Sequence, residues 1–429
     1  MRAGNERRSR GCAIFALALG AISLISGSRS ADAALGDCGQ PQVGGPVATD
    51  ALEILATAVG VSDCGGFDPC VCDANGSGAT TASDALLVLR KAVGENLELV
   101  CPCTVTTTTT TLPGPVLTTE LIVLTKREGS YTTADLAGTW DVNALGAGAD
   151  NYWTRGSLTV KSDGKFTGTL HESGGPSDNI SGRLAISSAG IITCSSGCGS
   201  DFGAALDSGK TVMVMTMTPE QGRATLLFIT RRAANYAQAN LTGTWQLNGL
   251  VSGPSEPFWN RGPLEIAANG AVTGSLRGSD GSLESFSPNL SLSSTGAITC
   301  SGDCDADVHG ALDSGKSVAA LTGSTADGST YLTVVTQRGG SYSSSDLAGT
   351  WALSSIASGE DTPWWSRATL EVEADGDFSG TLRGSDGSTE PISGALSISD
   401  DGIVTLADSP SFQCGMDEGT SVVVCTETW

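Results

Sequence analysis

Leu136-Ala-Gly-Thr-Trp140 is the stretch that decides the fold, because it returns as Leu241-Thr-Gly-Thr-Trp245 and again as Leu347-Ala-Gly-Thr-Trp351. The copies start at residues 136, 241 and 347, so the chain repeats a unit the size of a small domain three times. Internal repetition on this scale indicates tandem copies of one fold.

Other short patterns recur at the same spacing, and we call each set of equivalent positions a column. They are a Trp-x-Arg pair, a Leu-x-Val or Leu-x-Ile strand, a Thr-x-Arg-x3-Tyr segment and the Asp of an Asp-x-Gly turn. The pair begins at Trp153, Trp259 and Trp365, and the Leu-led strand at Leu158, Leu264 and Leu370. The segment begins at Thr125, Thr230 and Thr336, and the turn at Asp207, Asp313 and Asp417. The columns give three complete units.

Each unit is predicted to be β throughout. Short alternating runs are separated by turns such as Asp163-Gly164, Asn269-Gly270 and Asp375-Gly376, which are typical of tight hairpins. About eight short strands per unit predict an antiparallel up-and-down meander.

Two closures of the meander stay open. We expect separate eight-stranded barrels, in which residues 121–127 pair with residues 212–217. The alternative is one six-bladed propeller ring, in which residues 121–127 pair with residues 422–426 at the other end of the chain.

The opening strands of each unit, and Phe166-Thr-Gly-Thr-Leu170 after them, resemble those of avidin-like and other calycin barrels. This resemblance covers about thirty residues per unit and implies a barrel fold. No ligand contacts are carried over, because the loops between the matching strands do not correspond.

A different pattern precedes the repeats, in residues 73–94. Oxygen-bearing side chains occupy loop positions one, three, five, nine and twelve, Gly78 stands at position six, and the Ala79 carbonyl falls at position seven. Calcium takes six to eight oxygen ligands, and this spacing places them around one point. The predicted calcium ligands are Asp73, Asn75, Ser77, Ala79, Thr81 and Asp84.

A helix is expected from Asp84, with Leu86, Leu89 and Val93 on one face and Gly94 at its end. The segment resembles one repeat of a type I dockerin. A similar helix occurs 34 residues earlier, in residues 50–60, but the loop before it lacks most of the oxygen ligands. The resemblance therefore implies a calcium-stabilised docking domain with one intact site, and a cohesin-like or other protein partner.

The first residues and the cysteines predict export. Arg7, Arg8 and Arg10 precede an apolar run, and Ala31-Asp32-Ala33 is a small-x-small cleavage site, as in a secretory signal peptide.

Removing Cys12 leaves twelve cysteines, an even number that favours disulfides over zinc in an exported chain. Six of them form the local pairs Cys194/Cys198, Cys300/Cys304 and Cys414/Cys425, and we expect these three disulfides. The other six, whose pairing stays open, are Cys38, Cys64, Cys70, Cys72, Cys101 and Cys103.

The chain is strongly acidic, with a net charge of −23 and a pI near 4.3. This balance argues against nucleic acid and anionic membranes as partners, since both attract Lys and Arg. No later segment is long and apolar enough to predict a membrane span.

Few recurring residues could carry chemistry. An Arg beside a Trp in each unit is predicted to form a structural cation–π pair, with a sugar or carboxylate contact as the alternative. His171 and His309 fall at non-equivalent positions, and Asp207, Asp313 and Asp417 form the one clean acidic column. We therefore predict no enzyme activity, no catalytic residue and no organic cofactor.

Together these patterns predict a secreted protein that is mainly β with a small α domain. The expected parts are a signal peptide (1–33), a dockerin-like calcium-binding domain (34–103), a Thr/Pro-rich linker (104–115) and β-meander units over 116–219, 220–326 and 327–429. The expected function is non-catalytic binding of a surface polymer, glycan or protein by the repeated units. The alternatives are an extracellular hydrolase carried on the dockerin-like domain and β-barrels that each hold a small ligand.

Overall fold

The computed structural model describes two compact parts of the chain. The described residues are 48–62, 64, 69–75, 77, 79–93, 95, 97, 99–100, 118–147, 151–219, 223–254, 256–305, 307–359 and 363–428. The predicted signal peptide, the linker and most of the loop before residue 50 lie outside them. We describe the helical part, residues 48–100, and the β body, residues 118–428, separately.

The helical part contains α1 (Ala48–Ala58), the short 3-10 helix η2 (Pro69–Cys72) and α2 (Ala82–Ala92). The two α-helices pack through matching positions of the duplicated segment. The small buried core comprises Ala51, Ile54, Ala85, Val88 and the Cys64–Cys72 disulfide. The duplication predicted from the sequence therefore gives two equivalent helices around one core.

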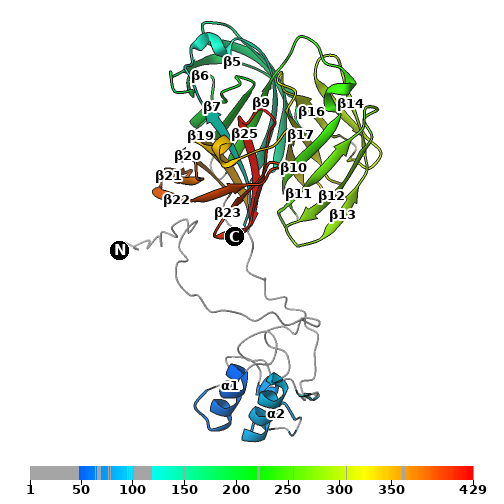
Figure 1. The fold of residues 1–429 in the computed structure, drawn as a ribbon, viewed down its shortest axis with the longest axis vertical. Helices are drawn as coiled ribbons and strands as arrows, with labels where there is room; N and C mark the ends of the chain where they lie inside the picture. Colours follow the sequence, from blue (N-terminus) through cyan, green and yellow to red (C-terminus); the bar gives the residue numbers. More distant parts are fainter. Residues whose placement is uncertain are drawn as a thin grey trace, which may run out of the picture. The chain divides into compact units, whose positions relative to one another are not determined.

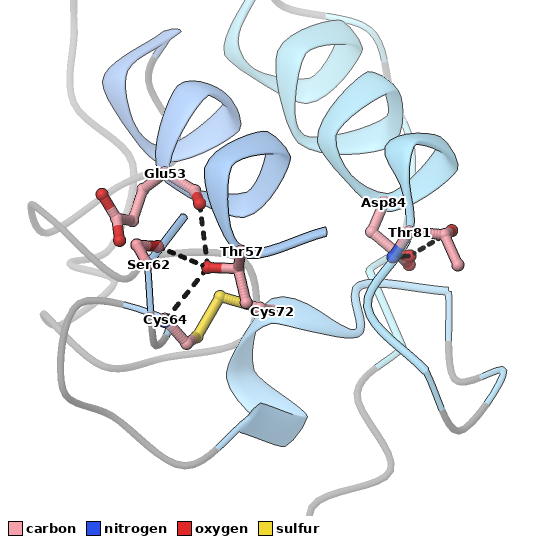
Figure 2. The surroundings of a disulfide bond; sticks show 7 residues. All are labelled: Glu53, Thr57, Ser62, Cys64, Cys72, Thr81 and Asp84. Carbon is pink, nitrogen blue, oxygen red and sulfur yellow. Dashed lines mark hydrogen bonds between the residues drawn. A yellow bond between two sulfur atoms is a disulfide. The ribbon is translucent and has the colours of Figure 1, made fainter. Parts of the chain in front are cut away.

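The Thr57 hydroxyl ties the end of α1 to this disulfide (Figure 2). It donates to the Glu53 carbonyl over 2.9 Å, shares a 2.8 Å hydrogen bond with Ser62, and accepts from the Cys64 amide over 3.0 Å. The segment after α1 is thus held by hydrogen bonds as well as by the covalent link.

The β body is built from three antiparallel sheets (Figure 1). The first closes on itself, and we call it barrel 1. Its eight strands are β2 (Gly138–Ala147), β3 (Tyr152–Val160), β4 (Lys165–Glu172), β5 (Ser177–Ile186), β6 (Ile191–Ser196), β7 (Ser200–Leu206), β8 (Val212–Thr218) and β9 (Ala224–Arg231). All of them are consecutive in the chain.

The second sheet, barrel 2, has nine strands instead of the predicted eight. They are β10 (Gly243–Ser252), β11 (Phe258–Ile266), β12 (Val272–Gly278), β13 (Leu283–Phe286), β14 (Asn289–Leu292), β15 (Ala297–Ser301), β16 (His309–Leu312), β17 (Val318–Ser324) and β18 (Thr330–Gln337). Between β13 and β14 stand only Ser287 and Pro288, and proline supplies no amide to a ladder. The strand equivalent to β5 is therefore broken in two. A bridge between Ala271 and Asn289 joins the second piece to the residue before β12, so the sheet curls round on itself.

The third sheet is a closed barrel of eight strands, barrel 3, and one of them comes from the other end of the body. It contains β19 (Gly349–Ser358), β20 (Trp364–Val372), β21 (Asp377–Gly384), β22 (Thr389–Ile398), β23 (Ile403–Leu406), β24 (Ser409–Met416), β25 (Val422–Thr428) and β1 (Thr119–Arg127). In β1, Leu121 lies opposite Ile356 of β19 and opposite Thr426 of β25.

The pairing of β1 corrects the sequence prediction. The barrels are separate, as expected, but residues 121–127 do not pair with residues 212–217, which lie beside β9 inside barrel 1. The predicted unit boundaries at 219/220 and 326/327 are also wrong, because β9 closes barrel 1 and β18 closes barrel 2. β1, β9 and β18 are equivalent strands, and barrel 3 takes its copy from the segment that precedes barrel 1.

Aromatic side chains close one end of each barrel. Each Trp of the Gly-Thr-Trp column donates from Nε1 to the carbonyl of the Leu four residues earlier, at 2.8 Å for Trp140 and 2.7 Å for Trp351. That Leu ends a short turn of helix: η3 (Thr133–Leu136), η4 (Gln238–Leu241) or α3 (Ser344–Leu347). These Trp side chains are fully buried, so the column is a core position.

A fourth apolar core lies between the barrels. It is formed by outward-facing side chains of strands from all three, including Leu121, Phe228, Leu250, Leu332 and Val424. β1 is buried along all nine of its residues, because one face lines barrel 3 and the other lines this shared core. The three barrels therefore form one body.

The three predicted local disulfides, Cys194–Cys198, Cys300–Cys304 and Cys414–Cys425, are all present. The first two close short loops, while Cys414 and Cys425 lie directly opposite each other on β24 and β25. Both of these last cysteines are fully buried, so this link belongs to the interior of barrel 3.

Candidate functional sites

The Trp-x-Arg column forms the joints between barrels. In each repeat the guanidinium lies over the Trp ring, with its carbon 3.7 Å from the ring centroid for Arg155 and Arg367 and 4.1 Å for Arg261. This confirms the predicted cation–π pairing. The pair acts between barrels rather than within one, because every Arg reaches into the next barrel.

Each Arg donates to one edge of its neighbour. Arg155 of barrel 1 donates from Nε to the Thr322 hydroxyl of barrel 2 over 2.7 Å, and Arg261 of barrel 2 donates to the Ser411 carbonyl of barrel 3 over 2.7 Å. Arg367 of barrel 3 completes the circle with a bond to Thr216 of barrel 1.

The indole N–H groups follow the same direction. Trp153 donates to Ser324 and Trp365 donates to Thr218, both over 2.8 Å. The joints therefore run from barrel 1 to 2, from 2 to 3 and from 3 to 1, which closes a ring of three. Burial lowers the pKa of Arg155, Arg261 and Arg367 to about 10, which leaves each guanidinium charged at neutral pH. Because the rings and guanidiniums are occupied here, they are not open to a sugar.

Both histidines lie at the first of these joints. The His171 ring lies 5.5 Å from the Trp153 ring, and His309 Nδ1 is 3.4 Å from an Arg155 nitrogen. They come from different barrels and lie on the two sides of one joint, so their positions in the repeats do not correspond. The sequence alone does not indicate that both lie at the same joint.

The acidic column forms a second, buried ring. Asp207, Asp313 and Asp417 are at most 1% exposed, and each accepts from backbone amides of its own turn. Asp207 Oδ1, for example, accepts from the amides of Thr211 and Val212 at 2.7 and 2.8 Å.

Each of these carboxyls also meets a hydroxyl of another barrel. Asp207 accepts from Ser421 over 3.1 Å and Asp417 accepts from Ser317 over 3.0 Å, while Thr211 bonds Asp313. Burial raises the pKa of Asp207 to about 7 and that of Asp417 to about 6. The column therefore joins three turns and has no face open to a polymeric substrate.

The predicted calcium loop brings its described oxygens together. Asp73 Oδ1 and the Asn75 side-chain oxygen both accept from the Ser77 amide at 2.9 Å, and the Ser77 hydroxyl donates to the Ala79 carbonyl over 3.1 Å. Gly78, predicted at the sharp turn, lies outside the described residues.

Asp84 links the two ends of the loop and begins α2. One carboxylate oxygen accepts from the Asn75 amide at 2.9 Å, and the other accepts from the Thr81 amide and hydroxyl, both at 2.8 Å (Figure 2). Asp73 is 2% exposed and Asp84 is fully buried. Burying two carboxylates in one short loop costs free energy that a divalent cation would offset.

The donor set therefore fits calcium, and the ligands would be Asp73, Asn75, Ser77, Thr81, Asp84 and the Ala79 carbonyl. Among the described residues, no three His, Cys, Asp or Glu side chains gather as a metal group. Only two of the predicted ligands are of these types, and the other oxygens come from an amide, two hydroxyls and the backbone.

The helical part also exposes two sets of apolar side chains, which together we call the helix face. They are Leu52 and Leu55 of α1 with Val59 just after it, and Leu86 and Leu89 of α2 with Val93 just after it, each 41–73% exposed. The two sets are equivalent, at a spacing of 34 residues. The sequence placed the second set on one side of the predicted helix, and the structure places that side outward.

Barrel 2 contains a cavity of about 490 Å³, against about 60 Å³ in barrel 3. Its walls are mainly Leu, Ile, Val and Phe side chains. Polar groups at one end include Asn260, Tyr331 and Thr333, and the rim carries Glu284, Asp303 and Asp305. A volume of this size is within the range of small-molecule sites in proteins.

Barrels 1 and 2 differ at the residue that precedes the Trp of the Trp-x-Arg pair. Tyr152 stands one residue before the Trp of the Trp-x-Arg pair, and its hydroxyl bonds Thr225 over 2.8 Å inside barrel 1. Its ring occupies the space beside Gly146, where an added Cβ would meet it at 2.1 Å. In barrel 2 the equivalent residue is Phe258, which lies at the cavity rim and is 39% exposed.

Comparisons with known proteins add little to these sites. No protein-family model matches the chain, and no curated protein matches it either. Among solved structures, a protein of unknown function from the DUF3598 family of Nostoc punctiforme is similar at 10% identity, with a TM-score of 0.18, over 69% of this chain and 97% of that one. No helix among the described residues is long and apolar enough to span a bilayer.

Proposed function

We propose that this protein is a secreted, non-catalytic binding protein that docks to a protein partner through a calcium-stabilised helical module. The helix face supports this proposal best. Six exposed apolar side chains at equivalent positions of two helices form a surface that water solvates poorly and a partner would cover. The adjoining loop, which begins α2, would hold the calcium ion that fixes the helix orientation.

Calcium binding is tested by calorimetry on the full chain after removal of metal by a chelator. We expect about one ion per chain, because only residues 73–84 supply the full set of oxygens. Asp84→Ala should abolish binding, whereas Glu95→Gln, an exposed acid after α2, should leave it unchanged. A stoichiometry of two would mean that the loop before residue 50 also binds, and no binding would refute the dockerin analogy.

Docking is tested by calorimetry against a panel of type I cohesin modules, in calcium and in chelator. Binding should require calcium and should be lost in the double variant Leu86→Asp/Leu89→Asp. The matched control is Leu283→Asp, which changes a 72% exposed Leu of barrel 2. Binding that survives the double variant would place the docking surface elsewhere.

A second proposed function is that barrel 2 binds a small, largely apolar ligand. The observation that favours it is the cavity, which is much larger than the one in barrel 3 although the strands of the two barrels are equivalent. The test is displacement of a neutral fluorescent probe from the full chain. Leu321→Trp, which fills the cavity, should reduce probe binding by at least about tenfold. The equivalent change in barrel 1, Met215→Trp, is the matched control. Unchanged probe affinity in the folded cavity variant would exclude this function.

Polymer binding by three equivalent sites has less support. The recurring Trp and Arg side chains, which were the strongest candidates for it, are engaged in the joints. A hydrolase based on the recurring Asp column has less support for the same kind of reason, since those carboxyls are buried between barrels.

A further inference from the structure

The cavity of barrel 2 opens beside a second hollow that is lined mostly by polar residues. This outer hollow, of about 380 Å³, lies between the loops around residues 256–258 and 278–284. Phe258, Asn260, Leu276 and Glu284 line both spaces, so the two are adjacent compartments with shared walls. Apolar residues predominate in the lining of the inner one, and polar residues outnumber apolar ones in the lining of the outer one.

The charged residues of both compartments are all acidic. Asp303 and Asp305 lie on the inner compartment, Glu256 and Asp280 on the outer one, and Glu284 on both. No Lys, Arg or His is among the described residues that line either space. Hydrogen bonds from Ser282 lower the pKa of Asp280, so that carboxyl is ionised at neutral pH.

Asn260 supplies a hydrogen-bond acceptor at the boundary. Its side-chain oxygen is buried and has no hydrogen-bond partner among the residues that the structure describes. A buried acceptor without a partner costs about 1–3 kcal/mol, and a donor on a ligand would remove that cost. The aromatic rings of Phe258 and Tyr331 line the same end of the cavity and favour a nearby cation.

We infer that barrel 2 binds an amphiphilic amine, with an apolar chain or ring system in the inner compartment and a protonated amino group at the acidic boundary beside Asn260 and Glu284. The inference rests on the second proposed function and names its ligand class. The apolar walls would supply most of the affinity, and the carboxylates would select the positive head group over a neutral or negative one.

The test compares ligands that share one apolar chain. Decylamine, decyltrimethylammonium, decanol and decanoate are titrated into the full chain at neutral pH, by calorimetry or by displacement of the neutral probe. We expect decylamine to bind at least about tenfold more tightly than decanol, and decanoate to bind most weakly. Decyltrimethylammonium should bind less tightly than decylamine, because it offers Asn260 no N–H donor.

Charge variants locate the preference. Glu256→Gln/Glu284→Gln should reduce the preference for the amine over the alcohol by about tenfold, because it weakens decylamine binding much more than decanol binding. The matched control is Glu390→Gln, since Gly387-Ser388-Thr389-Glu390 of barrel 3 corresponds to Gly281-Ser282-Leu283-Glu284 of barrel 2. Both variants change exposed or half-buried acids, with Glu284 and Glu390 on strands and Glu256 in the loop before β11, so folding should be retained.

The outcomes separate the two ideas. Equal affinities for decylamine and decanol, or a preference that survives Glu256→Gln/Glu284→Gln, would overturn the inference and leave the small-ligand function standing. Equal affinity for the two cations would overturn the role given to Asn260. If none of the four compounds binds, the proposed small-ligand function fails as well.

Discussion

Replacing Arg261 by Ala should destabilise the body by about 3 kcal/mol. The side chain is 5% exposed, its guanidinium lies 4.1 Å from the Trp259 centroid, and it donates to the carbonyls of Ser411 and Thr426 at 2.7 and 3.0 Å. A partly desolvated cation–π contact contributes about 1 kcal/mol, and hydrogen bonds from a charged donor contribute about 1.5–3 kcal/mol each. The cost of burying the charge offsets part of this sum, which leaves about 3 kcal/mol.

The assay is urea unfolding of the full chain, supported by a melting temperature lower by about 5–10 °C. Arg261→Lys should recover less than half of the loss, because an ammonium cannot stack and donate in the planar geometry of a guanidinium. The matched control is Arg277→Ala. Arg277 lies opposite Arg261 on β12, is exposed, and lowers the pKa of Arg261 by charge repulsion.

We expect Arg277→Ala to change the free energy of unfolding by less than about 0.5 kcal/mol. If Arg261→Ala also falls within this limit, the joints between barrels are not important for stability. The ring of three would then be held by the apolar core between the barrels alone.

Three further predictions concern the body. Replacing Cys414 and Cys425 together by Ala should cost about 2–3 kcal/mol in urea unfolding, because the link constrains the unfolded chain, and an unchanged midpoint would contradict this. Burial holds the pKa of Asp207 and Asp417 above the unfolded value of 3.8, so the folded state binds more protons and this stabilisation is lost as pH rises from about 4 to about 7. The loss should be on the order of 2–4 kcal/mol, and Asp207→Asn should flatten the pH profile; a profile that stays as steep would refute the assignment. Deleting residues 422–429 should remove hydrogen-exchange protection from barrel 3 while barrels 1 and 2 keep theirs, and loss in all three would show that the barrels do not fold independently.

Most of the fold could be predicted from the sequence, because the repeats place equivalent residues at equivalent strands and turns. Gly-Thr-Trp, Asp-Gly and Asn-Gly have strong local preferences, so strands, turns and local disulfides followed from neighbouring residues. The partner of β1 did not, since β1, β9 and β18 have the same alternation of side chains and only the folded chain decides which barrel each one closes. The joints between barrels were not predicted either. The Trp-x-Arg sequence is the same whether the Arg donates within its own barrel or to the next one.

Some of the candidate sites could likewise be predicted from the sequence and others could not. The calcium ligands could be proposed from spacing because they lie within twelve consecutive residues. The cavity of barrel 2 could not, since it depends on how Phe258 and Tyr152 orient at equivalent positions and on which small residues face them across the barrel. The helix face was visible as a pattern of Leu and Val, but the pattern alone did not say which side of the helix is covered.

The place of β1 in barrel 3 sets the order in which the chain can fold. Barrel 1 uses only residues 138–231 and barrel 2 only residues 243–337, so each can close as soon as its own strands are available. β1 precedes both, yet Thr125 meets its partner Ala352 across 227 residues of chain, and β25 comes later still. A chain made from its N-terminus must therefore keep β1, whose centre is the apolar run Leu121-Ile-Val-Leu124, unpaired while two barrels form after it. An open strand of this kind is a site for pairing with other chains, and the charges of Lys126 and Arg127 at its end oppose such pairing. Completion of barrel 3 pairs both edges of β1, so the strand can no longer pair with another chain.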